Sequence, residues 1–160
     1  MFVVFFMVVA GIIQFGLILW SINTVTQVAR DTARWAATQS MSPCDDTGGV
    51  NRASLAATAG QLAVQMQLVG YRAGTWTTAV PMDSVGPEGV GADWPNPDPS
   101  YLFASDCPPA DNQTPWMVRV RVNHVVPIFF PGLQFVAPPC GASGFCIAST
   151  AELRMEPKAP

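Results

Sequence analysis

The first part of this chain lacks charge, proline and cysteine altogether. No acidic or basic side chain occurs before Arg30, no proline before Pro43 and no cysteine before Cys44. Charged residues make up only 12% of the 160 residues, and the net charge is −3. Nucleic-acid binding requires clustered Lys and Arg side chains, whereas the eight present here are scattered. We therefore expect no nucleic-acid partner.

The sequence also has few of the residues from which active sites are built. Its single histidine, His124, lies in a strand-like segment, where a structural role is expected. The sequence has no phosphate-binding loop, zinc-ligand spacing or pair of catalytic carboxylates, and "GASG" (141–144) does not match the nucleophile elbow G-x-S-x-G. We predict that the protein is not an enzyme, has no cofactor and takes no small-molecule substrate.

One long apolar segment stands at the N-terminus instead. Residues 1–20 are apolar except for Gln14. About 20 helical residues rise ~30 Å, the thickness of a bilayer's hydrocarbon core, and Trp20 falls where an interfacial aromatic is expected. We predict that residues 1–20 span a membrane. The alternatives are a buried helix, which a chain of this size could hardly cover, and a cleaved signal peptide, which should carry a basic leader and a shorter apolar core.

The helical pattern continues past the apolar run. Apolar residues recur at three- and four-residue steps while polar residues fill the opposite side, which predicts a helix with one buried face. Residues 1–40 are therefore expected to form a single helix, membrane-embedded over 1–20 and amphipathic over 21–40, followed by a domain over 41–160. The residues predicted to face that domain are Ile22, Val25, Val28, Ala29, Ala33 and Ala36.

Stretches near the two ends of the chain carry a recognisable signature. "GIIQFG" (11–16) has a glycine, an amide and a Phe-Gly pair, and "INTVTQVARDTARWAA" (22–37) adds an Ala-Arg repeat. Together with "ASTAELRMEP" (148–157), these stretches resemble TadE-like pilus-assembly proteins. The resemblance implies a minor pilin or pseudopilin of the tight-adherence (Flp-type) pilus system, with one membrane helix and an extracytoplasmic domain.

The resemblance also implies a location and partners. It places the chain in the cytoplasmic (inner) membrane as a single-pass protein, or in a surface pilus, among other pilins, pseudopilins and pilus-assembly membrane proteins. Arg30 and Arg34 follow the apolar helix and by themselves favour the opposite orientation. Precursors in the family carry a prepilin-peptidase site ahead of the helix, a glycine shortly followed by a glutamate. The sequence here begins inside the helix, so either the true start lies upstream or the protein is not processed. On the first alternative we expect basic residues to precede Met1 in the precursor.

Gln14 raises a specific question, because an amide in lipid is costly without a hydrogen-bond partner. A neighbouring helix could supply that partner, and Gly11 and Gly16 would let the helix approach. On this interpretation Gly11, Gln14, Phe15 and Gly16 form a helix-packing surface against other pilins and the lipid bilayer. The alternative is that Gln14 bonds carbonyl groups of its own helix.

The remaining chain predicts an α+β domain, a second helix packed on a three- or four-stranded antiparallel sheet in a pilin-like arrangement. Apolar residues from Leu55 to Val69 repeat at helical spacing, with Gly70 as a stop signal. Segments 74–80, 116–126 and 147–157 have strand composition, and the last two alternate strictly. If these two strands pair, Arg119 and Arg121 face Glu152 and Glu156.

Two connections interrupt this pattern. Residues 81–115 hold eight prolines and six acidic groups, which predicts a long irregular loop. Residues 127–139 are apolar and proline-bounded, and the simplest expectation is that they cap the core of the sheet. The alternative is an exposed apolar tip in which Phe129, Phe130 and Phe135 touch a partner or the membrane. A rival function is a membrane-tethered binding module that uses the acidic loop, and a third is a secreted enzyme with a cleaved signal.

Four cysteines remain: Cys44, Cys107, Cys140 and Cys146. Cys140 and Cys146 bracket "GASGF", whose glycines let the chain turn back, so a local bridge is sterically easy. That leaves Cys44 to pair with Cys107. We predict both disulfides, and with them an oxidising, extracytoplasmic compartment. The alternatives are four reduced thiols in a cytosolic domain or, less in keeping with a single histidine, a metal site.

Overall fold

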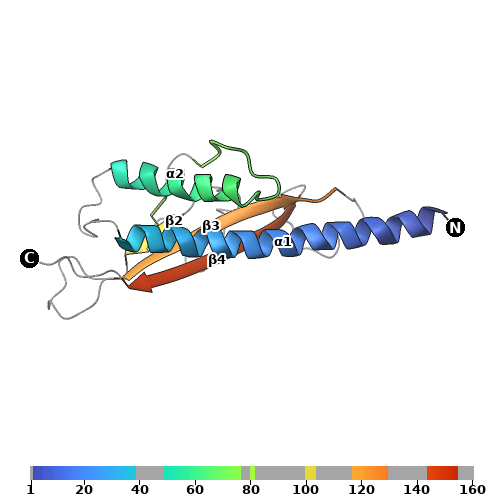
Figure 1. The fold of residues 1–160 in the computed structure, drawn as a ribbon, viewed down its shortest axis with the longest axis horizontal. Helices are drawn as coiled ribbons and strands as arrows, with labels where there is room; N and C mark the ends of the chain where they lie inside the picture. The colour runs from blue at the N-terminus through green and yellow to red at the C-terminus, as the bar shows by residue number, and fades with distance from the viewer. Residues whose placement is uncertain are drawn as a thin grey trace, which may run out of the picture.

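One long helix carries a small α+β domain on its C-terminal half. The computed structural model describes residues 2–38, 49–76, 80–81, 100–103, 117–129 and 144–154. The helices are α1 (Phe2–Thr38) and α2 (Gly49–Gln65), and the strands are β1 (Val80–Pro81), β2 (Ser100–Phe103), β3 (Met117–Pro127) and β4 (Gly144–Arg154). Figure 1 shows α1 as the longest element of the described part, with α2 and the sheet gathered against its C-terminal half.

The helix α1 is continuous from Phe2 to Thr38, as its sequence predicts, and residues 39–40 lie outside the described part. Its second half forms one side of the core. Val25, Val28, Ala29, Ala33 and Ala36 are fully buried, as predicted from their spacing. The inclusion of Ile22 in that face was wrong, because its side chain is 36% exposed. Burial begins on the neighbouring positions Ser21 and Thr24 instead.

The sheet is built around β3 and β4, which pair antiparallel from Met117↔Arg154 to Pro127↔Gly144. This pair and the two helices confirm the α+β class. The sheet order is β1-β2-β3-β4. β2 runs antiparallel to β3, but β1 pairs with β2 in parallel over two residues. The expectation of an entirely antiparallel sheet is therefore wrong at this edge.

Two sequence expectations in the middle of the chain also need correction. The segment 74–80 does not begin as a strand, because Gly74 has a φ of +82° and the amide of Thr75 donates to the carbonyl of Arg72 in a turn. Its Trp76 is buried at 4% exposure and its ring lies 4.5 Å from that of Tyr71, centroid to centroid. The segment 81–115, expected to be irregular, contains the strand β2.

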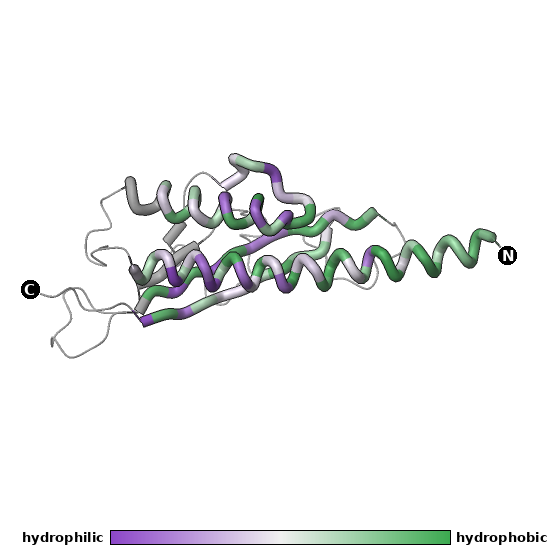
Figure 2. Tube along the Cα trace, viewed as in Figure 1, coloured by the Kyte–Doolittle hydropathy of each residue, from purple (hydrophilic) through white to green (hydrophobic). Residues whose placement is uncertain are grey.

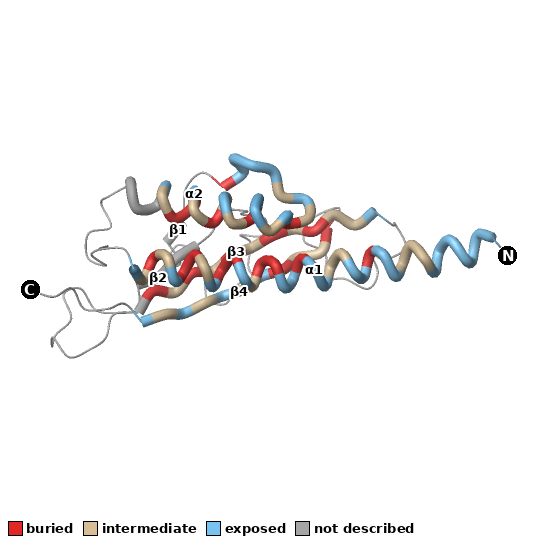
Figure 3. The backbone as a smooth tube through the Cα atoms, in the orientation of Figure 1, coloured by how far each residue is buried: buried red, intermediate tan, exposed pale blue. Residues whose placement is uncertain are grey.

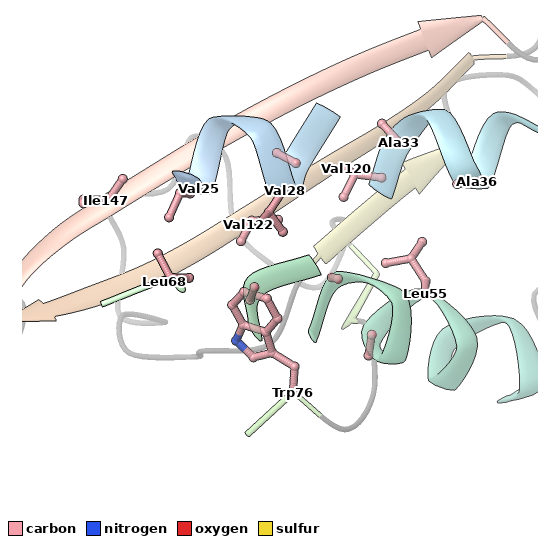
Figure 4. Close-up of a cluster of buried hydrophobic side chains, with 14 of the residues drawn as sticks. Val25, Val28, Ala33, Ala36, Leu55, Leu68, Trp76, Val120, Val122 and Ile147 are labelled. Atoms are coloured by element: carbon pink, nitrogen blue, oxygen red, sulfur yellow. The ribbon is translucent and has the colours of Figure 1, made fainter. Parts of the chain in front are cut away.

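The alternation predicted for the two long strands is confirmed where it can be followed. Val118, Val120, Val122 and Val126 are fully buried on β3, and Ile147 on β4 is 5% exposed. The same alternation places Trp116 and Met155 on the buried faces of the two strands, but both lie outside the described residues. Figure 4 shows the valines of β3 facing side chains from both helices. The labelled core residues are Val25, Val28, Ala33, Ala36, Leu55, Leu68, Trp76, Val120, Val122 and Ile147.

The helix α2 ends earlier than its sequence predicts. Gly70 was expected to stop it, but the helix ends at Gln65, and Gln67 takes the left-handed conformation with a φ of 53°. The amide of Leu68 donates to the carbonyl of Ala63 and that of Gln67 to Val64, the two bonds of a Schellman cap. Leu68 then turns into the core at 4% exposure.

One of the predicted cross-strand ion pairs is present. Arg119 lies opposite Glu152, and its Nε and terminal nitrogen donate to Glu152 Oε2 at 3.0 and 2.7 Å. The side chains of Arg119 and Glu152 are 40% and 34% exposed, so this ion pair adds little to the free energy of folding. Arg121 lies opposite Thr150 and donates to Asn123, so its predicted pairing with a glutamate was wrong for the described residues.

Candidate functional site

The N-terminal half of α1 leaves the domain as an apolar rod. Figures 2 and 3 show it hydrophobic and mostly exposed, in contrast to the covered C-terminal half. The most apolar 18-residue stretch of α1 is long and apolar enough to cross a membrane, and 6% of it is buried. The exposed large apolar residues on α1 are Phe2, Val3, Val4, Phe5, Phe6, Met7, Val8, Ile12, Ile13, Phe15, Leu19, Trp20 and Ile22.

This exposure bears on the alternatives that the sequence left open. A helix buried inside a soluble domain would be covered along its apolar stretch, and this one is bare. A cleaved signal peptide separates from the mature domain, whereas α1 runs without a break into the packed face formed by Val25, Val28 and Ala29. The structure therefore favours a retained membrane anchor.

Gln14 is the one residue in the apolar half of α1 that the structure buries, with 1% of its surface exposed. Its Nε2 donates to the carbonyl oxygen of Pro127 at 3.3 Å. Its Oε1 accepts from the amide of Phe129 at 3.2 Å. Both ends of the carboxamide are thus paired with the main chain at and just past the end of β3.

The geometry of this contact is that of a β-ladder. A carbonyl at one residue and an amide two residues later point to the same side of an extended chain, where a parallel neighbour strand would pair with both. The side chain of Gln14 takes the place of one residue of such a neighbour, around Ile128. A single glutamine therefore satisfies two main-chain groups beyond the end of the sheet.

Gln14 does not use the carbonyls of its own helix, so that alternative was wrong. Nor does the amide need another helix to be satisfied. Gly11 and Gly16 leave open space, since a methyl group added at either would meet, among the described residues outside that stretch of helix, no atom within 4 Å. Phe15 is 63% exposed. The predicted contact of these residues with a neighbouring helix stays a prediction and is taken up below.

The segment over 127–139 was expected to cap the core, and the structure describes only its first three residues. Among these, Phe129 is 63% exposed and does not cap the core, and residues 130–139 lie outside the described part. The position of Phe129 beside Gln14 puts an exposed aromatic next to the apolar half of α1. Phe130 and Phe135, named with it as a partner-contacting tip, lie outside the described residues.

The turn after α2 packs against the same end of β3. A Cβ on Gly70, whose φ is +82°, would come within 2.7 Å of the Pro127 ring. His124 is 7% exposed, and its Nε2 lies 2.7 Å from the carbonyl oxygen of Val69. Because a carbonyl only accepts, Nε2 carries the proton. Burial lowers the pKa of His124 below its ordinary 6.5, partly opposed by this hydrogen bond. The structural role predicted for His124 is confirmed.

Sequence reasoning missed several buried polar residues on α1. Ser21 and Thr24 donate to the carbonyls of Leu17 and Trp20, one turn back. These bonds satisfy the hydroxyls inside the helix and let small polar side chains face the sheet. A sequence signal existed, because both lie at helical spacing from Val28, but polar residues were assigned to the outer face.

Cys146 on β4 is disulfide-bonded. Cys44, Cys107 and Cys140 lie outside the described residues, so the predicted pairing stays a prediction. Among the residues that the structure describes, no three His, Cys, Asp or Glu side chains come together in a way that could hold a metal ion.

These features define a class of protein, an α+β domain carried on one long helix whose free half suits a membrane. A family model described as TadE-like protein matches residues 1–34, the apolar half of α1 and most of its packed half. The resemblance noted in the sequence is thereby confirmed for this segment, and it supports a component related to the Tad pilus. No curated protein and no solved structure matches the chain.

Proposed function

We propose that this chain is a structural or assembly component of a tight-adherence-type pilus, a TadE-like minor pilin or pseudopilin. The observation that carries the proposal is that α1 has two different halves. The N-terminal half is apolar and exposed, whereas the C-terminal half contributes to the core of the domain. In this role the first half anchors the protein in the inner membrane, and the domain over 41–160 stands on the extracytoplasmic side. The family match at residues 1–34 supplies the connection to the pilus.

The same helix then offers a surface to other pilin subunits. Gly11, Phe15 and Gly16 lie on the apolar half, and the two glycines leave room for a second helix, since no described residue outside that stretch of α1 comes near them. Helices in lipid associate through close packing at small residues, because lipid and side chains are equally apolar. Gln14 contributes here in a different way, by fixing the domain against the helix.

A complementation experiment tests the proposal. A strain that lacks the gene is supplied with the epitope-tagged full chain, either as wild type or with Gly11→Ile and Gly16→Ile. We expect the wild type to fractionate with the inner membrane, restore pili and co-purify with pilin subunits in mild detergent. The double variant should stay in the membrane and lose most of the co-purifying pilin, because the added side chains keep a second helix away.

Val8→Ile is the matched control, because Val8 is 57% exposed on the same half of α1 and the change also adds apolar volume without removing a glycine. It should behave as wild type. Wild-type chain in the soluble fraction would contradict membrane anchoring. Full piliation without any co-purifying pilin, in wild type and variants alike, would contradict the structural role in the pilus.

A further inference from the structure

The exposed side of α1 changes from apolar to polar at a defined level. Trp20 is 57% exposed and Ile22 is 36% exposed, and Ile22 is the last exposed large apolar residue on the helix. Asn23, the next residue, is exposed and polar, and exposed Gln27 follows one turn later. For a helix that crosses a bilayer, this change marks the boundary between lipid and water at residues 20–23.

The domain, however, reaches the helix below that boundary. Gln14 holds Pro127 and Phe129 through two hydrogen bonds, and it precedes Ile22 by eight residues. At about 1.5 Å per residue the two levels differ by ~12 Å along the helix axis. A domain that stopped at the water boundary would have no contact with Gln14. The end of β3 is therefore carried into the apolar zone of α1.

The composition of this end of the domain agrees with such a position. β3 ends and β4 begins on the side toward the N-terminus of α1 (Figure 1). No Asp, Glu, Lys or Arg occurs in the sequence between Arg121 and Glu152, and burial favours the neutral form of His124, which lies in this stretch. The charged residues of the two strands, Arg119, Glu152 and Arg154 among them, lie toward the opposite end of the pair. The sheet thus has one charged end and one end without charge.

Three main-chain groups at the uncharged end are also paired as lipid requires. Main-chain groups in a membrane must find partners within the protein, because hydrocarbon supplies none. Gln14 satisfies the carbonyl of Pro127 and the amide of Phe129, and the carbonyl of Val69 accepts from His124. What faces outward is the ring of Phe129, 63% exposed. A phenylalanine ring is apolar, so it suits the hydrocarbon region in which the level of Gln14 places it.

We infer that the uncharged end of the β3–β4 pair, at Pro127–Phe129, sits in the bilayer rather than above it, with Phe129 in contact with lipid. This inference rests on the proposed membrane anchoring of α1. Gln14 sets the depth, because it ties the end of β3 to a fixed level of the membrane helix. The domain is then held by two elements, the helix and the end of the sheet.

Fluorescence of a polarity-sensitive label in vesicles tests this inference. Phe129→Cys, Ile12→Cys and Ala53→Cys are each made in the full chain, labelled with NBD without reduction, and reconstituted in phosphatidylcholine–phosphatidylglycerol vesicles. All three residues are exposed, so the label should not disturb folding, which circular dichroism verifies. Ile12 reports on the anchor, and Ala53, in the first turns of α2, reports on the distant end. The labelled wild type serves as the blank for native cysteines.

We expect the labels at 12 and 129 to emit at short wavelength, to resist iodide and to be quenched by doxyl lipids, and the label at 53 to show the opposite. If the label at 129 is quenched by iodide like the label at 53, while the label at 12 is shielded, the inference is overturned but the membrane anchoring of α1 is supported. If 129 resists iodide but is not quenched by doxyl lipids, another protein segment covers it, and lipid contact is wrong. Exposure at position 12 would overturn both the anchor and the inference.

Discussion

Gln14 illustrates how a polar side chain can be stable in an otherwise apolar helix. Burying an unpaired amide in an apolar environment would cost free energy. The chain avoids this cost, because both ends of the Gln14 carboxamide form hydrogen bonds with the main chain. The same two bonds satisfy Pro127 and Phe129 past the end of the β3–β4 ladder. The side chain therefore stabilises the strand end as much as the strand end stabilises the side chain.

Replacing Gln14 with Leu should destabilise the domain without impairing membrane insertion. The variant leaves the carbonyl of Pro127 and the amide of Phe129 without partners in an apolar setting, at a cost of about 1–3 kcal/mol. Hydrogen exchange in detergent micelles should show faster exchange at the Phe129 amide, and thermal unfolding should shift to lower temperature. The chain should still fractionate with the membrane.

Ile13→Leu provides the control, because Ile13 is 58% exposed and adjacent in sequence. It should leave exchange at Phe129 unchanged. Gln14→Glu is informative as well. A carboxyl buried in an apolar setting is expected to stay protonated, and the protonated group can donate to Pro127 and accept from Phe129, so we expect a smaller loss than for Gln14→Leu. Equal exchange in wild type and Gln14→Leu would show that the contact contributes nothing.

We predict that the free energy of unfolding decreases in mild acid because of His124. Burial favours its neutral form, so the folded chain binds fewer protons at this site than the unfolded chain, whose His has a pKa near the ordinary 6.5. The stabilising contribution is complete above that value and is lost as the pH falls from 6.5 toward the lowered pKa of the folded state. Denaturant unfolding between pH 7.5 and 5.5 measures it.

The matched variant for this measurement is His124→Gln, whose amide can still donate to Val69 but does not titrate. Its unfolding free energy should depend less on pH over the same interval, which lies above the ordinary range of carboxyl groups. Identical pH dependence in the two proteins would contradict the assignment of the effect to His124.

At the scale of elements, the end of α2 places a non-glycine residue in a backbone conformation that favours glycine. Gln67 adopts the left-handed conformation that a Schellman cap normally gives to glycine. A non-glycine residue there costs about 1 kcal/mol or somewhat more. The helix nevertheless ends here, because Leu68 must enter the core at 4% exposure. Packing of the next residue outweighs the local preference.

Gln67→Gly should therefore stabilise the protein by about 1 kcal/mol. Gln67 is exposed, so the change removes no packed atoms. Gln65→Gly is the matched control: it is also exposed but lies at the last helical position, where glycine should destabilise by up to about 1 kcal/mol. Chemical denaturation compares the three proteins. A loss of stability in Gln67→Gly would mean that the left-handed cap is not formed in solution.

For the molecule as a whole, the cysteines are expected to tie the long loop to the helix. We predict bridges Cys140–Cys146 and Cys44–Cys107, the second closing a loop of roughly 60 residues that contributes on the order of 4 kcal/mol by chain entropy. Non-reducing peptide mapping of protein from native membranes should recover both linked peptides. Free thiols at Cys44 and Cys107, or exchange of partners, would contradict the pairing.

Sequence alone was sufficient for the elements whose periodicity is long. Three patterns extend over several turns or residues: the apolar run, the three- and four-residue steps around Val28, and the alternation around Val120. Each therefore predicted which side of its element is buried. These patterns predicted α1, most of the core and the pair β3–β4. The residues matched by the family model, 1–34, lie in this same regular helix.

Tertiary structure alone decided how distant segments meet. The sequence named Gln14 as anomalous but gave no sign that its partners are Pro127 and Phe129, because more than a hundred residues separate them along the chain. Short strands such as β1 and β2 likewise depend on what lies beside them, since two to four residues carry too little local preference. Local periodicity fixes which face of an element is buried, whereas the contact that covers it is a property of the folded chain.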